Sequence, residues 1–299
     1  MKKYALVVDS SCGLTKKQAE KLGWFYLPLY IDIDGKNYSD GVDLDATTLF
    51  DKFTLKSEVK TSMFNLVTAE TLFTELSKEY DEIIVYPISK YLSNSYATLK
   101  TMTADFPKLR VIESVEIASL ILIDLFWFEL EMKKDSSKME EYLKFIEAGS
   151  FQKSITLIPK YNKYLVKGGR LHPAAALIAK MFNIVPLIKW ENGQLLKEGI
   201  GRNFYKTILK NAEQKAKDFK VSDNHSLKTI VLHSGSTEED KKKYQETVSD
   251  LFKKESDLFS TPSVVSIHVG PEAYVLIVTE VPTEYEKAID ERFQILKEK

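Results

Sequence analysis

The stretch Tyr4-Ala-Leu-Val-Val-Asp-Ser-Ser11 is a short apolar run that ends in acidic and hydroxyl side chains. Thr15-Lys-Lys-Gln18 follows with the spacing of a capping box, in which Thr and Gln side chains satisfy free amides at the start of a helix. The stretch therefore predicts a strand, a polar loop and a helix that runs to about Leu22.

The same order of elements returns twice further along the chain. Residues 82–88 predict a buried strand, 89–96 a polar loop and 97–105 a helix. Residues 109–112 predict another strand, which ends at Glu113-Ser114 before a very apolar helix. Strands that alternate with helices form a parallel sheet, and ligands usually lie at the carboxyl ends of its strands. We expect the loop side chains at these ends to share one edge: Ser10, Ser11, Ser93, Asn94, Ser95 and Ser114.

Two excursions interrupt this pattern. Residues 27–33 and 36–38 flank Asp34-Gly35, a turn signal that predicts a hairpin. Residues 46–52 and 66–78 have helical spacing, and a polar segment with Lys60, Thr61 and Ser62 lies between them. The acidic run 40–45 resembles a calcium loop only superficially, because no Glu closes it at the required spacing.

After Gly149 the pattern changes. Asn192-Gly193 lies between two apolar runs and predicts a second hairpin. In order, we expect strand 155–158, helix 174–181, strands 184–190 and 194–199, helix 204–219, strand 229–232, helix 238–254, strands 264–268 and 274–278, and helix 283–296. The fold class predicted is two-domain α/β, with a parallel-sheet domain over residues 1–150 and an α/β domain with a mixed sheet over residues 151–299.

Composition narrows the functional class. The 299 residues are 44% hydrophobic and 28% charged, which is typical of a globular protein, and the net charge of -1 argues against nucleic-acid binding. A single cysteine, Cys12, excludes an intrachain disulfide and favours a cytoplasmic location. Residues 117–130 are very apolar, but Asp124 and Glu129 interrupt them, so a buried helix is expected rather than a membrane span. The N-terminal residues lack the pattern of a signal peptide.

Common catalytic motifs are missing from the sequence. It has no P-loop and no dinucleotide fingerprint, so ATP and NAD binding are unsupported and no cofactor is expected. The four histidines show no metal-ligand spacing, so no metal is expected. No Gly-x-Ser-x-Gly elbow is present. A hydrolase triad of Ser93, His268 and an acid such as Asp9 is an alternative that the sequence does not exclude.

A Gly-Gly-Arg turn stands out in the second half. In Lys167-Gly168-Gly169-Arg170, adjacent glycines allow backbone conformations and close approaches that other residues resist. The Arg that follows offers a rigid fork of donors for a carboxylate or phosphate. This pattern indicates an anion-recognition turn, or otherwise an ordinary turn before a helix that starts near Pro173.

Several motifs in order resemble the DegV family of bacterial fatty-acid-binding proteins, the carrier subunits of fatty acid kinase. They are Val8-Asp-Ser-Ser, Pro28-Leu, Tyr38-Ser-Asp-Gly-Val-Asp43, Lys60-Thr-Ser62, Leu92-Ser-Asn-Ser-Tyr96, Val111-Ile-Glu-Ser114, Leu165-Val-Lys-Gly-Gly-Arg-Leu171 and Ile267-His-Val-Gly-Pro271. The resemblance runs nearly end to end, and the Gly-Gly-Arg turn and the late His-x-Gly-Pro are its most specific parts.

The resemblance implies a carrier, not an enzyme. One long-chain fatty acid would lie in a tunnel between two domains, and a separate kinase subunit would phosphorylate its carboxylate for phospholipid synthesis. Transient membrane contact would allow ligand exchange. The implied carboxylate-binding residues are Ser93, Thr61, Ser62, Arg170 and His268, with Asn94, Ser95, Gly168 and Gly169 in support.

Two places depart from the family pattern. Asn94 and Ser95 stand where Gly-Thr is usual, which alters the head-group loop or adds a donor. Val269 and Glu272 replace Thr and Gly of the late motif. An inward Glu272 would weaken carboxylate binding, and we expect it to point outward because an unpaired buried charge is costly.

Three functional hypotheses follow. The preferred one is the fatty-acid carrier. The second is a hydrolase or acyl-transfer enzyme that uses Ser93 and His268 on a lipid-like ester. The third is a regulatory protein whose lipid site tunes docking through charged helices such as 238–254.

Overall fold

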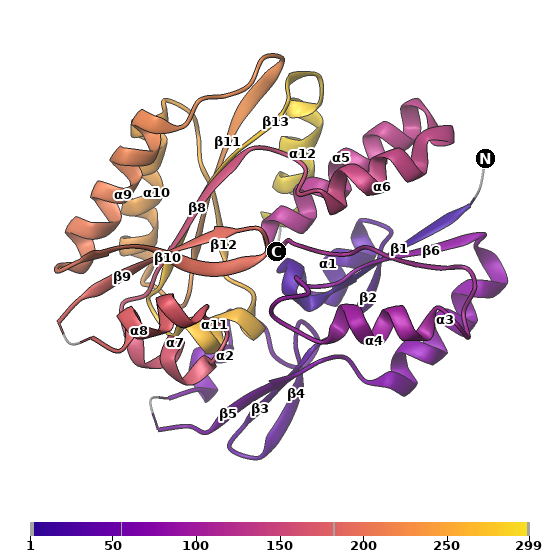
Figure 1. Cartoon of the computed structure of the whole chain (residues 1–299), viewed down its shortest axis with the longest axis horizontal. Coiled ribbons are helices and arrows are strands. Elements are labelled where there is room, and N and C mark those ends of the chain that lie inside the picture. The colour runs from indigo at the N-terminus through magenta and orange to yellow at the C-terminus, as the bar shows by residue number, and fades with distance from the viewer. Residues whose placement is uncertain (1–2, 55, 182, 298–299) are drawn as a thin grey trace. The chain divides into compact units, whose positions relative to one another are not determined.

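The computed structural model describes residues 3–54, 56–181 and 183–297 (Figure 1). The chain groups into two compact units. The first holds Met1–Ser150 with Pro262–Val264, and the second holds Phe151–Thr261 with Val265–Lys299. Each unit has its own sheet and its own hydrophobic core.

A four-stranded sheet with the order β2-β1-β6-β7 forms the centre of the first unit. Its strands are β1 Tyr4–Asp9, β2 Phe25–Leu27, β6 Glu82–Tyr86 and β7 Leu109–Val111. Every neighbouring pair is parallel, which confirms the sheet predicted from the alternating strands and helices. Inward side chains such as Val7, Phe73, Ile83 and Leu99 are buried together in its core.

Helices of the first unit follow the predicted order. They are α1 Lys16–Lys21, α3 Leu66–Glu79, α4 Ser95–Met102, α5 Ser119–Lys134 and α6 Met139–Glu147, with short 3-10 turns η1 Ser10–Cys12 and η2 Ser136–Lys138. The capping box of Thr15 and Gln18 forms at the start of α1. The apolar helix α5 is buried, and its Asp124 accepts hydrogen bonds of 2.5 Å from both Tyr86 Oη and Ser150 Oγ. A buried charge is tolerated there because donors match it.

A smaller antiparallel sheet, β4-β3-β5, holds the predicted hairpin. Strands β3 Tyr30–Ile33 and β4 Lys36–Ser39 meet at Asp34 and Gly35, both with positive φ. The segment around Thr61 is strand β5 Val59–Ser62, whereas the sequence had suggested only a polar connection. The helix expected over 46–52 shrinks to α2 Leu49–Lys52, because Asp45 accepts from the Thr47 and Thr48 amides and holds them in a turn.

The second unit is built on a six-stranded mixed sheet with the order β10-β9-β8-β13-β11-β12. Its strands are β8 Lys153–Ile158, β9 Val185–Glu191, β10 Gln194–Gly201, β11 His225–His233, β12 Asp257–Ser260 and β13 Tyr274–Pro282. Only β11 and β12 pair in parallel. The β9–β10 hairpin is confirmed, with Asn192 and Gly193 both at positive φ as a two-residue hairpin turn requires. Strand β12 was not predicted.

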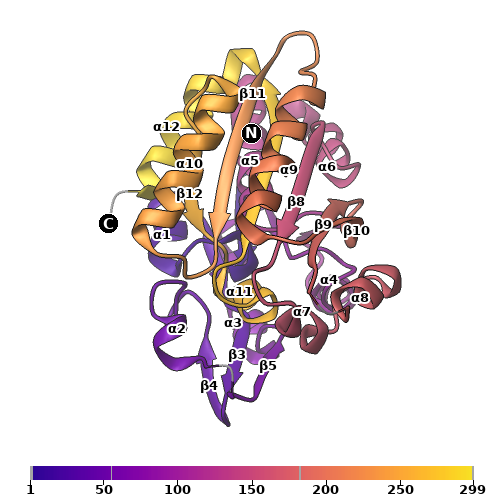
Figure 2. The same cartoon turned by 90° about the vertical axis from the view of Figure 1, so that its left-hand side faces the viewer.

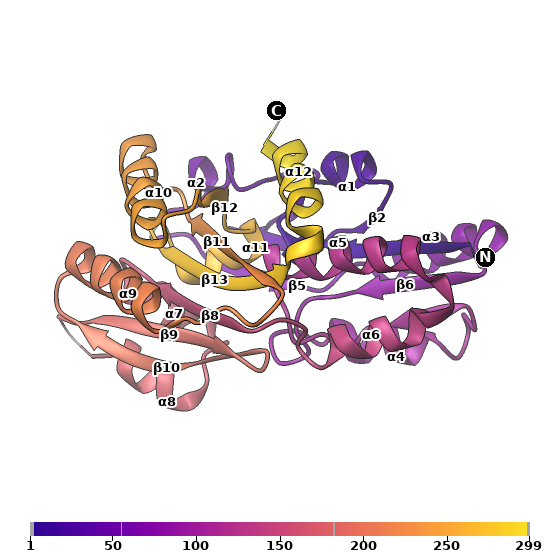
Figure 3. The same ribbon diagram turned by 90° about the horizontal axis from the view of Figure 1, so that it is seen from above.

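Helices cover both faces of this sheet (Figures 2 and 3). They are α7 Asn162–Gly168, α8 Pro173–Ala179, α9 Phe204–Asp218, α10 Glu238–Phe252, α11 Ser263–Val269 and α12 Glu286–Lys297, with η3 Thr283–Tyr285 before α12. Ile208 of α9 and Val248 of α10 pack with Ile158 of β8. Leu165 of α7 and Ala175 of α8 pack with the neighbouring Leu157. Successive strand residues face opposite sides, so the two helix groups lie on opposite faces.

Helix α11 corrects one prediction. The run Val264-Val-Ser-Ile-His268 has the β-branched composition of a strand, yet it is helical. Val264 and Ile267, three residues apart, are both buried, and Ser266 Oγ donates to the Thr261 carbonyl. Packing at helical spacing outweighs the intrinsic preference of β-branched residues. His268 therefore lies on a helix and not at a strand end.

Candidate functional site

The Gly-Gly-Arg stretch closes helix α7. Gly168 is the last helical residue, and Gly169 has a φ of 67°, the left-handed conformation that commonly ends a helix. Arg170 folds back, and its Nη1 donates to the Gly168 carbonyl at 2.7 Å. The structure thus has a helix where the sequence suggested only a turn, and it places the Arg170 guanidinium at the carboxyl end of that helix.

His268 packs against Gly168. A Cβ added at Gly168 would lie 3.0 Å from His268 Nδ1 and 3.1 Å from its Cβ, so any side chain at this position would press against the His268 ring. Burial, with a smaller contribution from the Arg170 charge, lowers the pKa of His268 to about 4. The imidazole is therefore neutral at pH 7 and presents one N–H donor.

Gly270 repeats this arrangement in reverse. It has a φ of 81°, and an added Cβ would lie 2.2 Å from Cδ2 of Tyr164 on α7. Tyr164 and Gly168 are one turn apart on α7, whereas His268 is in the last turn of α11 and Gly270 directly follows that helix. The two most specific sequence motifs are therefore in contact, each supplying a glycine against the other's ring. The contact brings Arg170 and His268 together within the second unit.

Ser93, Asn94 and Ser95 form the start of helix α4 in the first unit, just beyond the carboxyl end of β6. Ser93 Oγ lies 2.8 Å from Ser95 Oγ and accepts from the Ser95 amide at 3.2 Å. Ser93 is partly buried, Ser95 is buried, and Asn94 is an exposed N-cap whose side chain makes no capping hydrogen bond. A hydroxyl beside the amides of a helix N-terminus is a favourable place for an anion.

Thr61 and Ser62 are consecutive residues of strand β5. Thr61 pairs with Ile31 and Ser62 with Tyr30 across the small sheet. Side chains alternate along a strand, so Thr61 and Ser62 point to opposite faces. Thr61 is partly buried and Ser62 is exposed. At most one of the two hydroxyls can therefore face a given ligand.

The buried carboxylates of Asp9 and Asp40 hold loops of the first unit in place. The sequence predicted no such role for them, and Asp9 entered only as a possible acid of a hydrolase triad. Asp9 is the last residue of β1 and accepts from the Ile88 amide at 2.7 Å, from the Ser11 amide at 3.0 Å and from Ser11 Oγ at 2.5 Å. It thereby fixes the start of the loop that carries Ser93. An acidic side chain directly after an apolar strand was the available signal.

Asp40 is 2% exposed, and its carboxylate accepts from the Val264 amide at 3.3 Å and from the hydroxyls of Ser263 and Ser10. Burial is the main reason that the pKa values of Asp9 and Asp40 both rise to about 6. Each carboxyl therefore changes charge near neutral pH, while its hydrogen bonds keep the loops in place.

Glu272, a departure from the family pattern, has a φ of 56°. Its carboxylate forms an ion pair with Lys160, which precedes α7, and accepts from Tyr161 Oη at 3.2 Å. The negative charge is therefore balanced by a nearby cation. The pair joins the turn after α11 to the residues that begin α7.

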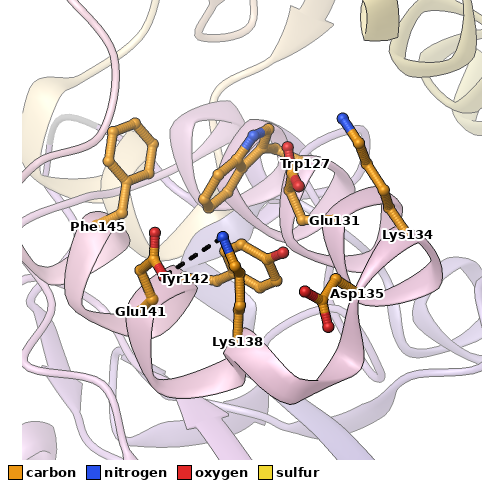
Figure 4. A pocket seen from close by; sticks show the side chains of 8 residues that line it. All are labelled: Trp127, Glu131, Lys134, Asp135, Lys138, Glu141, Tyr142 and Phe145. Carbon is orange, nitrogen blue, oxygen red and sulfur yellow. Dashed lines mark ion pairs between the residues drawn. The ribbon is translucent and has the colours of Figure 1, made fainter.

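A separate hollow of about 600 Å³ lies between α5 and α6 (Figure 4). The centroid of the Trp127 ring lies 4.6 Å from that of the Phe145 ring and 5.6 Å from that of the Tyr142 ring. Charged side chains form the rest of its lining: Glu131, Lys134, Asp135, Lys138 and Glu141. None of the predicted carboxylate-binding residues lines it.

Among the described residues, no group of three or more His, Cys, Asp or Glu side chains could hold a metal ion. In the same residues, no helix is long and apolar enough to cross a membrane.

Comparison with known proteins agrees with these motifs. A family model described as uncharacterised proteins of the DegV family matches residues 3–280. A DegV domain-containing protein of Mycoplasmopsis pulmonis is 38% identical over 291 residues, which cover 97% of this chain and 100% of the relative. One from Staphylococcus aureus is 26% identical over 280 residues, covering 93% and 99%.

Solved structures share the fold. A fatty-acid-binding DegV family protein of Thermus thermophilus has a TM-score of 0.78 at 20% identity and covers 93% of this chain and 100% of its own. DegV of Bacillus subtilis, described as a fatty acid binding protein, has a TM-score of 0.79 at 19% identity, with coverages of 93% and 99%. A stearic acid-binding protein of Eubacterium ventriosum has a TM-score of 0.77 at 23% identity, with coverages of 92% and 98%.

These similarities extend over nearly the whole chain. They include both motifs that pack together in the second unit, the Gly-Gly-Arg end of α7 and the His-x-Gly-Pro end of α11. The chain belongs to the DegV family.

Proposed function

We propose that this protein binds one long-chain fatty acid and presents its carboxylate to a separate ATP-dependent kinase subunit, feeding phospholipid synthesis in the cytoplasm. The observation that carries the proposal is the packing of His268 of α11 against Gly168, next to Arg170 at the end of α7. The fatty-acid-binding proteins that share the fold support the same ligand class. Residues 1–150 and 151–299 would form its two domains.

Carboxylate chemistry fits these residues. A carboxylate that leaves water needs donors, and a guanidinium, an imidazole N–H and hydroxyls supply them without a metal. Arg170 and His268 would serve from the second unit. Ser93, supported by Asn94, Ser95 and the α4 amides, would serve from the first unit with either Thr61 or Ser62.

Most of the affinity would come from the hydrocarbon tail. Each buried methylene contributes about 0.8 kcal/mol, so a long acyl chain contributes roughly 10 kcal/mol before ordering costs. The head-group residues would then fix orientation. The carrier needs no ATP site of its own, because the kinase subunit supplies the phosphoryl group.

The α7–α8 segment also suits transient contact with a membrane. Residues 160–190 contain six cationic residues, Lys160, Lys163, Lys167, Arg170, Lys180 and Lys189, and no acidic residue. Leu177, at 71% exposed, and Met181, at 52%, project from or just beyond α8. Basic side chains beside exposed apolar ones favour an anionic lipid surface. We propose that fatty acid is exchanged there.

Denaturing extraction of the purified protein followed by mass spectrometry tests the ligand assignment. We expect nearly one fatty acid per chain from the native protein. Arg170→Ala removes a charge-assisted donor and Ser93→Ala removes a hydroxyl, so each should weaken binding by about tenfold to a hundredfold. Arg170→Lys keeps the charge but not the fork and should lie between the native protein and Arg170→Ala.

The same protein separates the competing functions. A carrier alone should leave thioesters and phosphate esters of fatty acids intact, and with ATP and the kinase subunit it should yield acyl phosphate. Hydrolysis without a partner, abolished by Ser93→Ala or His268→Ala, would instead establish the hydrolase. Extraction of no lipid, with no binding of added fatty acid, would refute the carrier.

Association with vesicles tests the membrane contact. Leu177→Ser combined with Met181→Ser should reduce sedimentation with vesicles containing phosphatidylglycerol by about tenfold or more, because two apolar anchors are lost. The control is Val67→Ser, an exposed apolar residue of α3. If both variants associate equally with the vesicles, α8 is not the part of the protein that contacts lipid.

A further inference from the structure

Helix α11 is held at both of its ends. Its first two residues belong to the first unit and its other residues to the second. At the start, the Asp40 carboxylate accepts from the Val264 amide at 3.3 Å and from the Ser263 hydroxyl. At the end, His268 packs against Gly168 of α7. One short helix therefore connects a buried carboxylate to the histidine proposed for the head group.

Asp40 is itself firmly fixed. It is 2% exposed, its amide donates to the Leu29 carbonyl at 2.9 Å, and its carbonyl accepts from Tyr26 Oη at 3.1 Å. The Ser10 hydroxyl donates to the carboxylate, and Ser10 Oγ accepts from the Leu29 amide at 3.2 Å. These groups are buried, and hydrogen bonds are stronger in such surroundings than in water. The carboxylate therefore offers α11 a rigid support.

A helix transmits a constraint from its first turn to its last. Val264 and His268 are four residues apart on α11, which makes them neighbours on one side and joins the His268 amide to the Val264 carbonyl. The ring fits closely against α7, since a Cβ added at Gly168 would lie 3.0 Å from His268 Nδ1. A small displacement of the first turn would therefore change where the imidazole N–H points.

We infer that Asp40 is a positioning residue for the fatty-acid carboxylate, because it fixes the first turn of α11 and thereby orients the His268 imidazole. Asp40 acts through the helix and not by touching the ligand. An imidazole N–H makes a good hydrogen bond only when it is aimed at its acceptor. This deepens the proposed function and rests on it, since His268 serves there as a carboxylate donor.

Asp9 offers a competing route to the head group. Its carboxylate is electrostatically coupled to that of Asp40, and it accepts from the Ile88 amide at 2.7 Å, before the loop that carries Ser93. A change at Asp40 would then act through Ser93. Asp40 bonds directly to α11 but influences Asp9 through its charge, so the structure favours the route to His268. Double-mutant cycles separate the two routes, because only residues that act together are coupled.

Binding of stearate to the delipidated protein, measured by calorimetric titration, tests the assignment. Asp40→Asn keeps the shape but replaces an acceptor oxygen by a donor, so a misaligned imidazole should weaken binding by about tenfold. In the His268→Ala background the same substitution should change binding by less than about twofold, whereas in the Ser93→Ala background it should still cost about tenfold. Stearyl alcohol lacks the carboxylate, so its binding should respond to Asp40→Asn by less than about twofold.

Asp124→Asn is the matched control. Asp124 is another aspartate of the first unit with 2% exposure, and it accepts from Tyr86 Oη and Ser150 Oγ at 2.5 Å. The substitution makes the same change of charge and shape at a buried site on α5. It should leave stearate binding within about twofold of the native protein, in both the native and the His268→Ala backgrounds.

The ring signal of His268 in a nuclear magnetic resonance spectrum reports its position without any ligand. The signal is assigned by its absence from His268→Ala, and it should shift in delipidated Asp40→Asn while the His172 signal stays in place. Ser263→Ala removes the hydroxyl on the helix side of the contact, so it should shift the same signal and weaken stearate binding by about threefold. This variant tests the contact even if Asp40→Asn does not fold.

Equal losses for Asp40→Asn in the native and His268→Ala backgrounds, or a loss that disappears in the Ser93→Ala background instead, would overturn the assignment while the proposed function stands. An unmoved His268 signal would overturn it as well. A native protein that binds no stearate would refute the proposed function, and the carboxylate role of Asp40 with it.

Discussion

Replacing Gly270 by alanine is expected to lower the free energy of unfolding by about 4 kcal/mol. The new Cβ would meet Tyr164 Cδ2 at 2.2 Å, and the φ of 81° is costly for any residue with a Cβ. Overpacking costs about 1–3 kcal/mol and the left-handed backbone about 1–2 kcal/mol. Chemical denaturation followed by circular dichroism measures the loss.

Gly169→Ala provides the matched control. Its φ of 67° carries the same kind of backbone strain, but nothing lies within 4 Å of an added Cβ, so only about 1 kcal/mol should be lost. Tyr164→Ala removes the ring that Gly270→Ala would strike, so the double variant should cost less than the sum of the single ones. Equal losses for Gly169→Ala and Gly270→Ala would show that α7 and the α11 turn are not locked by this contact.

A second large effect should arise at Asp40 when the pH changes. The folded pKa of about 6 exceeds the ordinary value of 3.8, so the folded protein holds this proton more tightly than the unfolded chain. Its contribution to stability is complete below the unfolded pKa and is lost as the pH rises through about 6. A shift of about two pKa units corresponds to about 3 kcal/mol.

Asp40→Asn isolates this contribution, because it keeps the shape and removes the titration. The native protein should gain about 3 kcal/mol of stability relative to the variant between neutral pH and about pH 4. Urea denaturation across that pH range gives the difference. Asp45→Asn is the control, because the pKa of Asp45 is lowered and its titration lies below this range. A pH-independent difference for Asp40→Asn would contradict the assignment.

The comparison must be made between variants because two histidines act in the opposite direction. Burial lowers the pKa values of His233 and His268 from 6.5 to about 4. The unfolded chain therefore binds these protons first, and stability falls as the pH drops from 6.5 toward 4. In the native protein the aspartate and histidine contributions partly cancel, whereas the histidine contributions drop out of the difference between native protein and Asp40→Asn. That difference contains Asp40 and its electrostatic coupling to Asp9.

Local signals in the sequence determined much of the fold. The capping box of Thr15 and Gln18, the Asp34-Gly35 turn and the Asn192-Gly193 turn each specify a structure within a few residues, and each was predicted correctly. The parallel sheet was predicted from the order of elements, because alternating strands and helices are typical of that architecture. These features depend on short-range hydrogen bonds and backbone preferences, which the sequence records directly.

Contacts between distant residues decided the rest. The run at His268 is helical, with Val264 and Ile267 each buried at helical spacing, which outweighs its strand-like composition. Gly168 and Gly270 were recognisable as motifs, but only the folded chain shows that each makes room for a ring about 100 residues away in sequence. Strand β5 directs Thr61 and Ser62 to opposite faces of the small sheet, which follows from the strand pairing. The ion pair of Glu272 with Lys160 follows from tertiary packing. Such outcomes follow from the packing of the whole unit, which no local pattern encodes.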